Sequence, residues 1–330
     1  MTARTVQFTA PRRVEVVPVG LPERHRELLV RTLYSGISAG TELLAYRGEL
    51  DDATAADETI SSLPGTFRYP FSYGYSCVGR VEQGTTTIPA GSTVFAFHPH
   101  QDRFVVADAD VVPLDPDTDP RVATLFPLVE TALQLTLDAG PALADTVVVQ
   151  GLGSVGLLTA LLLRRAGAKV LAAEPRRFRR EVAAELGITA VPPADLPSCV
   201  AAATEGRGAP LLVELSGVPS ALAGGLALLG HEGTALVGSW YGTKPVPLPL
   251  GAEFHRRRLT VRSSQVSRIP AAQQARWDVS RRRTVARALL DELPLAALAT
   301  TEFRFEDAAE AYAAIDRGEP GLLHVALRYE

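Results

Sequence analysis

The segment that most constrains the fold of this chain is a glycine-rich run in its middle, Gly-Leu-Gly-Ser-Val-Gly at residues 151–156. An apolar run at 146–150 precedes it directly, and an apolar run of helical length, 157–165, follows it. A strand, a turn with glycines at this spacing and a helix form the nucleotide-binding half of a doubly wound sheet. The segment therefore predicts a Rossmann domain.

Each residue of this turn has an expected role. Gly151 permits the tight turn, Gly153 lets the backbone approach a pyrophosphate, and Gly156 lets the helix pack on the strand. The backbone amides of Ser154 and Val155 begin the helix and bind phosphate charge. We therefore predict that these five residues hold a dinucleotide.

The next apolar run, 169–173, ends at Glu174, at the spacing of an acidic residue that binds the adenosine ribose. A carboxylate there favours NAD(H), because it would repel the 2′-phosphate of NADP(H). Arg176 and Arg179 follow and could instead bind that phosphate, or they could be solvated on the first turn of a helix. We expect NAD(H) rather than NADP(H).

The chain divides into regions of different pattern. Apolar runs at 146–150, 169–173, 211–215 and 234–238 alternate with helical segments, which predicts a parallel sheet covered on both faces. Before them, strand-like alternation at 13–17, 27–31, 76–82, 92–97 and 103–106 predicts an antiparallel, β-rich lobe. Helices are expected at 276–292 and 305–317, and a last strand at 323–329. The predicted α/β fold has a β-rich domain of residues 1–125 and 264–330 and a Rossmann domain of 126–263.

The composition of the chain excludes several classes of binding partner and structural site. The net charge of −4 makes nucleic acid and anionic membranes unlikely partners. The cysteines, Cys77 and Cys199, are too few for a disulfide framework or a four-cysteine zinc site. The most apolar stretch, 155–163, is too short to cross a bilayer, and the N-terminus does not read as a signal peptide. We therefore expect a cytoplasmic protein that acts on a small molecule.

Over essentially its whole length the chain resembles the medium-chain dehydrogenase/reductase superfamily of the alcohol dehydrogenase type. The resemblance rests on the order of the lobes and on local patterns at 35–42, 74–76, 214–217 and 236–238. It implies a GroES-like catalytic domain, NAD(P)-dependent hydride transfer and a homodimer. It also implies that two strand ends flank the cofactor, and these contain Ser216, Gly217, Gly238 and Ser239.

The chain departs from this family where the family binds zinc. Ser38 stands where the family has a cysteine, Tyr75 where it has a histidine, and Ser76 where it has a glutamate. Neither a neutral hydroxyl nor a phenol is a usual zinc ligand. We therefore expect no catalytic metal, and the charge and proton needed at a forming alkoxide must come from protein hydrogen bonds.

Tyr75 is the first candidate for this role, although it could equally fill the space that a metal vacates. His98 and His100 flank Pro99 and, at strand spacing, would point to the same face, where one could act as acid or base. They could also be surface residues on a turn, or form a metal site with Glu42.

Further candidates carry equally open roles. Ser38 counts among the catalytic hydroxyls, and Thr41 and Glu42 follow a glycine turn that could face substrate or simply cap a helix. Glu130 could accept a substrate hydroxyl or stabilise a helix N-terminus. Trp240 and Tyr241 could stack on a substrate ring or form a dimer contact.

These observations favour a zinc-independent alcohol dehydrogenase or ketone reductase. An alkene or quinone reductase is the alternative among enzymes, because a hydride delivered to a conjugated carbon needs no zinc. A dinucleotide-binding protein without catalytic activity is the alternative outside them.

Overall fold

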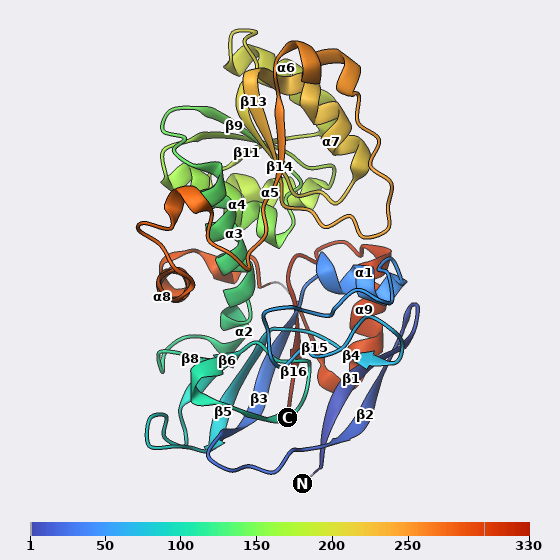
Figure 1. Cartoon of the computed structure of the whole chain (residues 1–330), viewed down its shortest axis with the longest axis vertical. Coiled ribbons are helices and arrows are strands. Elements are labelled where there is room, and N and C mark those ends of the chain that lie inside the picture. The colour runs from blue at the N-terminus through green and yellow to red at the C-terminus, as the bar shows by residue number, and fades with distance from the viewer. Residues whose placement is uncertain (1, 300) are drawn as a thin grey trace. The chain divides into compact units, whose positions relative to one another are not determined.

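The computed structural model describes residues 2–299 and 301–330, and their contacts divide the chain into two compact units. The first unit contains the residues up to Pro127 together with Arg287–Glu330, and the second contains Leu128–Ala286. Both the blue start and the red end of the chain therefore contribute to the first unit (Figure 1). No helix in the ranges described is long and apolar enough to cross a membrane.

The first unit is built mainly on antiparallel strand pairs. Its larger sheet has the order β15-β16-β3-β5-β6-β8, with β7 also paired to β3, and its smaller sheet has the order β2-β1-β4. Val6 and Phe8 lie on one face of β1 and are fully buried, while Gln7 between them is only half-buried, so that face of the strand supplies the core. The strands are β1 (Thr2–Ala10), β2 (Arg13–Gly20), β3 (Leu28–Ile37), β4 (Phe71–Ser72), β5 (Cys77–Gln83), β6 (Thr93–Ala96), β7 (Arg103–Val106), β8 (Val111–Pro113), β15 (Thr301–Arg304) and β16 (Val325–Arg328).

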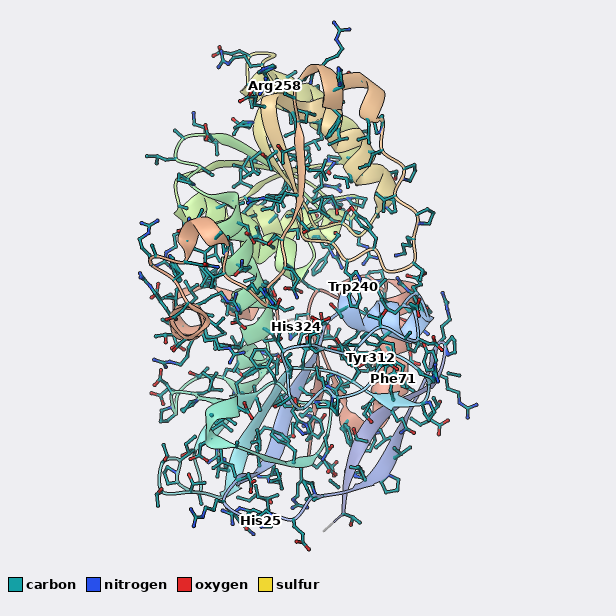
Figure 2. The ribbon with its side chains drawn as sticks, viewed as in Figure 1. His25, Phe71, Trp240, Arg258, Tyr312 and His324 are labelled. Atoms are coloured by element: carbon teal, nitrogen blue, oxygen red, sulfur yellow. The ribbon has the colours of Figure 1, made fainter. Side chains whose placement is uncertain are left out.

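Aromatic side chains fill one core of this unit. The Phe8 ring stacks on Phe71 at 5.1 Å and meets Tyr312 edge-on at 5.2 Å; Figure 2 labels Phe71 and Tyr312. Tyr312 belongs to a helix near the end of the chain, so this core joins the two sequence segments of the unit. The helices here are α1 (Thr41–Arg47), α2 (Pro120–Ala123) and α9 (Ala308–Arg317).

The second unit contains a parallel sheet of the order β11-β10-β9-β12-β13-β14. Its central strand β9 is fully buried at Val147, Val148 and Val149, as expected where helices cover both faces of a sheet. The strands are β9 (Thr146–Gln150), β10 (Lys169–Ala173), β11 (Thr189–Val191), β12 (Ala209–Glu214), β13 (Leu229–Val237) and β14 (Thr260–Ser263). The helices are α4 (Ser154–Arg165), α5 (Arg177–Glu185), α6 (Leu196–Ala203) and α7 (Pro219–Gly225), while α3 (Phe126–Ala139) and α8 (Val279–Glu292) run across the unit boundaries.

The predicted fold class is confirmed: a β-rich, GroES-like unit and a Rossmann unit. The division of the chain differs from the predicted one, since residues 264–286 group with the second unit. Two contacts with α3 account for this: Ser264 Oγ donates to the Asp138 carboxylate at 2.7 Å, and Arg282 pairs with Glu130 at 2.9 Å. As functional domains, the predicted boundaries remain a proposal.

Candidate functional site

The glycine turn joins β9 to α4, and two of its glycines have no room for a side chain. Gly151 has a φ of +90°, and a Cβ there would lie 2.7 Å from Ser216 Cα. A Cβ on Gly156 would lie 2.0 Å from the Gly151 carbonyl oxygen, so helix and turn pack backbone to backbone. Gly153 differs, because the nearest atom to its Cβ position is Arg179 Nη1 at 3.7 Å. The backbone at the start of α4 is therefore open on this side.

The turn lies where the strand order reverses. β9 pairs with β10 on one side and with β12 on the other, and the chain winds outward in both directions from this pair. Ligands of open α/β sheets bind outside the carboxyl ends of the strands at such a point. The turn after β12 carries Ser216 and Gly217, and that after β13 carries Gly238 and Ser239. The predicted cofactor residues thus gather at one edge of the sheet.

Glu174 lies beside the glycine turn and is only 3% exposed. Its carboxylate accepts the backbone N–H groups of Leu152 and Arg176, both at 2.9 Å. Arg179 Nη1 lies 3.9 Å from the same carboxylate. Burial lowers the pKa of Arg179, while the charge of Glu174 opposes that effect.

Arg179 also carries an unused donor. Its Nε atom is buried and has no hydrogen-bond partner. Buried donors are nearly always satisfied in folded proteins. Arg179, whose Nη1 lies 3.7 Å from the Cβ position of Gly153, therefore has a donor at Nε that an anionic ligand could satisfy.

A buried carboxylate organises the end of β12. Glu214 is fully buried and accepts hydrogen bonds from Ser216 N at 2.7 Å, from the Ser216 hydroxyl, and from the Tyr241 hydroxyl at 2.6 Å. Burial and this bond raise the pKa of Tyr241. The Tyr241 ring packs against the hydrophobic core of the second unit. Its predicted role in stacking on a substrate therefore competes with a structural role.

The turn after β13 contacts the turn after β12. Gly217 N donates to Ser239 Oγ at 2.9 Å, and a Cβ on Gly238 would lie 2.6 Å from a methyl group of Leu215. Trp240 follows and is 44% exposed, which leaves much of its ring accessible (Figure 2).

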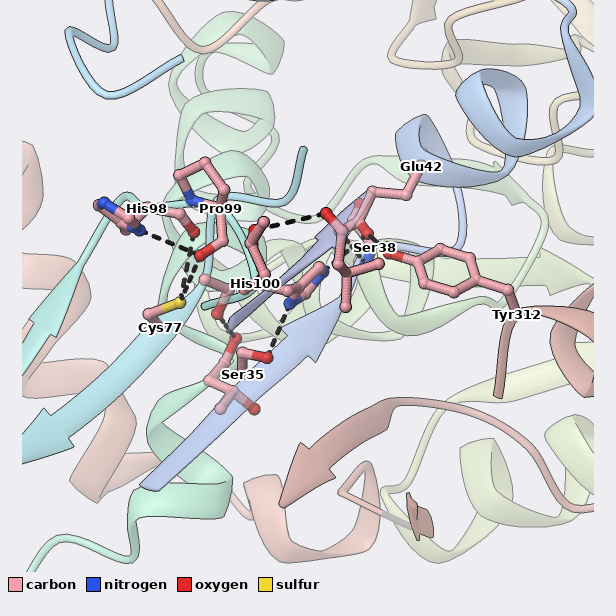
Figure 3. Close-up of polar contacts among 12 residues, drawn as sticks. Ser35, Ser38, Glu42, Cys77, His98, Pro99, His100 and Tyr312 are labelled. Carbon is pink, nitrogen blue, oxygen red and sulfur yellow. Dashed lines mark hydrogen bonds and ion pairs between the residues drawn. The ribbon is translucent and has the colours of Figure 1, made fainter. Parts of the chain in front are cut away.

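The first unit buries a second polar cluster, shown in Figure 3. Glu42 and His100 are both fully buried, and His100 Nε2 lies 2.9 Å from Glu42 Oε2. The other ring nitrogen of His100 lies 2.7 Å from Ser35 Oγ. Tyr312 donates its hydroxyl to Glu42, and the backbone N–H of Ser38 donates to Glu42 Oε1 at 2.8 Å. A buried charge needs such partners.

Tyr75 lies next to this cluster and is half-buried. Burial and the charge of Glu42 raise the pKa of Tyr75 to about 12, while hydrogen bonds with the side chains of Ser38 and Thr41 oppose the shift. The phenol is therefore protonated at neutral pH. The structure thus brings together five predicted catalytic residues: Ser38, Thr41, Glu42, Tyr75 and His100.

His98 does not join them. Its ring stacks on Phe104 at 4.1 Å, its Nδ1 lies 3.0 Å from the Pro99 carbonyl, and burial lowers its pKa to about 4. The prediction that His98 and His100 share a face is wrong, because β6 ends at Ala96 and strand alternation does not extend to them. Figure 3 shows the two rings directed to different neighbours.

Glu130 belongs to the second unit, where the residue is 3% exposed. Arg282 donates to it through Nε at 3.1 Å and Nη2 at 2.9 Å, and also bonds Gln134 at 2.6 Å. This pair links α3 to α8. The predicted substrate contact would have to compete with a buried ion pair.

Two of the residues expected at the positions of the family's zinc ligands, Tyr75 and Ser76, make contacts within the protein. Ser76 donates its hydroxyl to the Thr124 carbonyl at 2.6 Å, and Tyr75 is engaged as described. Within residues 2–299 and 301–330, no group of three His, Cys, Asp or Glu side chains could hold a metal ion.

Some residues of these clusters were not singled out from the sequence. Tyr312 lies 270 positions from Glu42, and Ser35 lies 65 positions from His100, so no local pattern connects them. Glu214 directly precedes a Leu-Ser-Gly turn, but a single acidic residue at a strand end has many possible roles.

Comparison with known proteins agrees with this geometry. Residues 154–280 match a family model described as zinc-binding dehydrogenase. The chain is 34% identical to L-threonine 3-dehydrogenase of Bacillus subtilis over 135 residues, which cover 39% of each protein. It is 30% identical to 5-exo-hydroxycamphor dehydrogenase of Pseudomonas putida over 190 residues, which cover 54% of this chain and 50% of that one. These matches span at most half the length of either relative.

The fold comparison covers the whole chain. The alcohol dehydrogenase from Thermus sp. ATN1 superposes with a TM-score of 0.78 over 99% of this chain and 100% of that one, at 22% identity. This chain therefore has the two-domain fold of the alcohol dehydrogenases, and most of its second unit matches the zinc-binding dehydrogenase family model.

Proposed function

We propose that this protein is a zinc-independent, NAD(P)-dependent oxidoreductase that transfers a hydride between a nicotinamide cofactor and a small hydroxyl or carbonyl substrate. One observation carries the proposal. The glycine turn at 151–156 excludes side chains at its first and third glycines and is open at the second. This is the arrangement that lets a backbone approach a pyrophosphate at the start of a helix.

The residues around the turn fit a dinucleotide. The orphaned Arg179 Nε supplies a donor for an anion, and the Glu174 carboxylate supplies an acceptor for ribose hydroxyls. Because Glu174 carries the full charge nearest the turn, we propose NAD(H) as the preferred cofactor. Arg176 and Arg179 are the groups through which NADP(H) would be accepted. The bound dinucleotide would supply or accept the hydride.

Tyr75 is the proposed proton donor in the reducing direction. As the hydride adds to the carbonyl carbon, the electron pair of the C=O π bond moves to oxygen, and Tyr75 gives its proton to that oxygen. The tyrosinate that remains takes a proton back from water. Ser38 and Thr41, which hydrogen-bond the phenol, stabilise the tyrosinate during this step.

The donor set does not fit zinc. Two hydroxyls and a phenol whose pKa is raised to about 12 replace the cysteine, glutamate and histidine of the family, and neutral oxygen donors of this kind are poor zinc ligands. We therefore derive no step through a metal. The expected result is less than one metal per chain by elemental analysis and full activity in chelator; one bound zinc per chain would overturn this part of the proposal.

The whole proposal is tested by calorimetric titration with NADH and NADPH, followed by a substrate panel read through NADH absorbance. Binding together with turnover of ketones or alcohols supports the proposal. Absence of binding to either dinucleotide refutes it.

An alkene or quinone reductase is the second candidate, and the hydroxyl and phenol groups of Ser38, Tyr75 and Ser76 at the expected metal-ligand positions favour it equally. Oxidation of NADH with an enone but not with a ketone would select it. Tight binding without turnover of any substrate would select a non-catalytic nucleotide-binding protein. We also propose a homodimer, which sedimentation equilibrium would test.

A further inference from the structure

Glu214 is a buried carboxylate at the nucleotide edge of the sheet, and the proposed reaction does not use it. Three donors surround it: Ser216 N at 2.7 Å, the Ser216 hydroxyl, and the Tyr241 hydroxyl at 2.6 Å. Burying an ionised carboxylate is costly unless hydrogen bonds replace its water. Its position therefore depends on Tyr241 and on the turn that contains Ser216.

Ser216 in turn supports the glycine turn. A Cβ on Gly151 would lie 2.7 Å from Ser216 Cα and 2.8 Å from Ser216 N, so the two backbones are in direct contact. Leu215 N also donates to the Gln150 carbonyl at 2.8 Å, one residue before Gly151. A displacement of Ser216 would therefore be transmitted to the first residue of the glycine turn.

A second link fixes Ser216 from the other side. Val218 N donates to Ser216 Oγ at 3.1 Å, and Gly217 N donates to Ser239 Oγ at 2.9 Å. Ser239 lies two residues before Tyr241, which bonds Glu214. The turns after β12 and β13 thus form one closed network around a single carboxylate.

We propose that Glu214 is a positioning residue for the nucleotide site, and that Tyr241 fixes its orientation. This inference rests on the proposed function. Glu214 holds Ser216, Ser216 supports Gly151, and the amides at the start of α4 follow Gly151 in the same turn. Tyr241 would then contribute through its hydrogen bond to Glu214, and a contact with the substrate is not needed to explain its role.

The first test is the affinity of the full-length protein for NADH by calorimetry. Tyr241→Phe removes one hydrogen bond to a charged group and is expected to weaken NADH binding about tenfold. Tyr34→Phe is the matched control, because Tyr34 hydrogen-bonds Glu302 in the first unit; its affinity should stay within twofold of the wild type. Wild-type affinity in Tyr241→Phe would overturn the proposal.

The second test needs no nucleotide. In hydrogen exchange of the unliganded protein, Tyr241→Phe should raise exchange about tenfold at the amides of 151–155 and 216–217 and leave β9 unchanged. Unchanged exchange in the glycine turn would overturn the proposal, whatever the affinity. If the wild type binds no dinucleotide, the proposed function fails, and exchange still decides whether Glu214 positions the turn.

Discussion

The two candidate sites of this protein differ in the groups that form them: backbone in one and side chains in the other. In the second unit, the glycine turn offers backbone, and its geometry depends on side chains being absent at Gly151 and Gly156. In the first unit, the cluster around Glu42 and His100 is made of side chains from four separate segments. A substitution that adds a side chain at Gly151 or Gly156 should disrupt the glycine turn. A substitution that removes a hydrogen bond should disrupt the cluster around Glu42 and His100.

The largest expected effect is on dinucleotide binding at the glycine turn of residues 151–156. Gly153→Asp should abolish dinucleotide binding, because a carboxylate would occupy the open side of the turn and repel the pyrophosphate. The fold should survive, since the nearest atom to the Cβ position is 3.7 Å away. Calorimetry and circular dichroism measure the two outcomes.

Gly153→Ala is the control for that substitution, because it adds a Cβ without charge and should bind dinucleotide far better. Equal affinity of Gly153→Asp and wild type would refute the assignment of the site.

Gly156→Ala should destabilise the second unit by roughly 3 kcal/mol or more, because its Cβ would lie 2.0 Å from the Gly151 carbonyl oxygen. Urea unfolding followed by fluorescence measures the loss. Gly224→Ala is the matched control: Gly224 lies in α7 with nothing within 4 Å of its Cβ position, so it should gain about 0.5–1 kcal/mol. Equal stability of the two variants would contradict the packing argument.

The side-chain site is tested by Tyr75→Phe, which removes the proposed proton donor. We expect kcat to fall about 100-fold, the usual scale of general acid catalysis, with NADH affinity unchanged. Tyr73→Phe, a buried neighbour whose ring lies 6.0 Å away, should keep most of the activity. A Tyr75→Phe enzyme with wild-type kcat would remove Tyr75 from the mechanism.

The last expected effect, which appears only at acid pH, concerns the stability of the first unit. Burial lowers the pKa of His98 to about 4 from an ordinary value of 6.5, so the unfolded chain binds a proton more readily than the folded one. The His98 contribution to stability is therefore fully present above pH 6.5 and is lost as pH falls from 6.5 towards 4. The loss is at most about 3 kcal/mol.

His98→Phe should keep the stacking on Phe104 and make stability less dependent on pH in that window, measured by urea unfolding at pH 7 and pH 4.5. His25→Gln, at an exposed position, is the control. An unchanged pH dependence in His98→Phe would show that burial of this ring does not drive acid unfolding.

The sequence by itself determined the elements and sites that depend on neighbouring residues. Strands β9 and β10 lie at the predicted residues, and the glycine turn lies between β9 and α4, because both follow from local periodicity and from backbone freedom at glycine. Helix α8 begins at Val279, three residues after the predicted start, since helix ends depend on contacts as well as on pattern.

Only the tertiary structure decided which polar side chains meet. Glu42 joins Tyr312, Glu130 joins Arg282, and Glu214 joins Tyr241, and nothing near each glutamate in the sequence names its partner. Tertiary packing also gives His98 and His100 different neighbours, Phe104 and Glu42, although the two histidines are only two residues apart in the sequence. A buried charge needs hydrogen-bond donors, and packing across the whole unit determines which donors lie next to it.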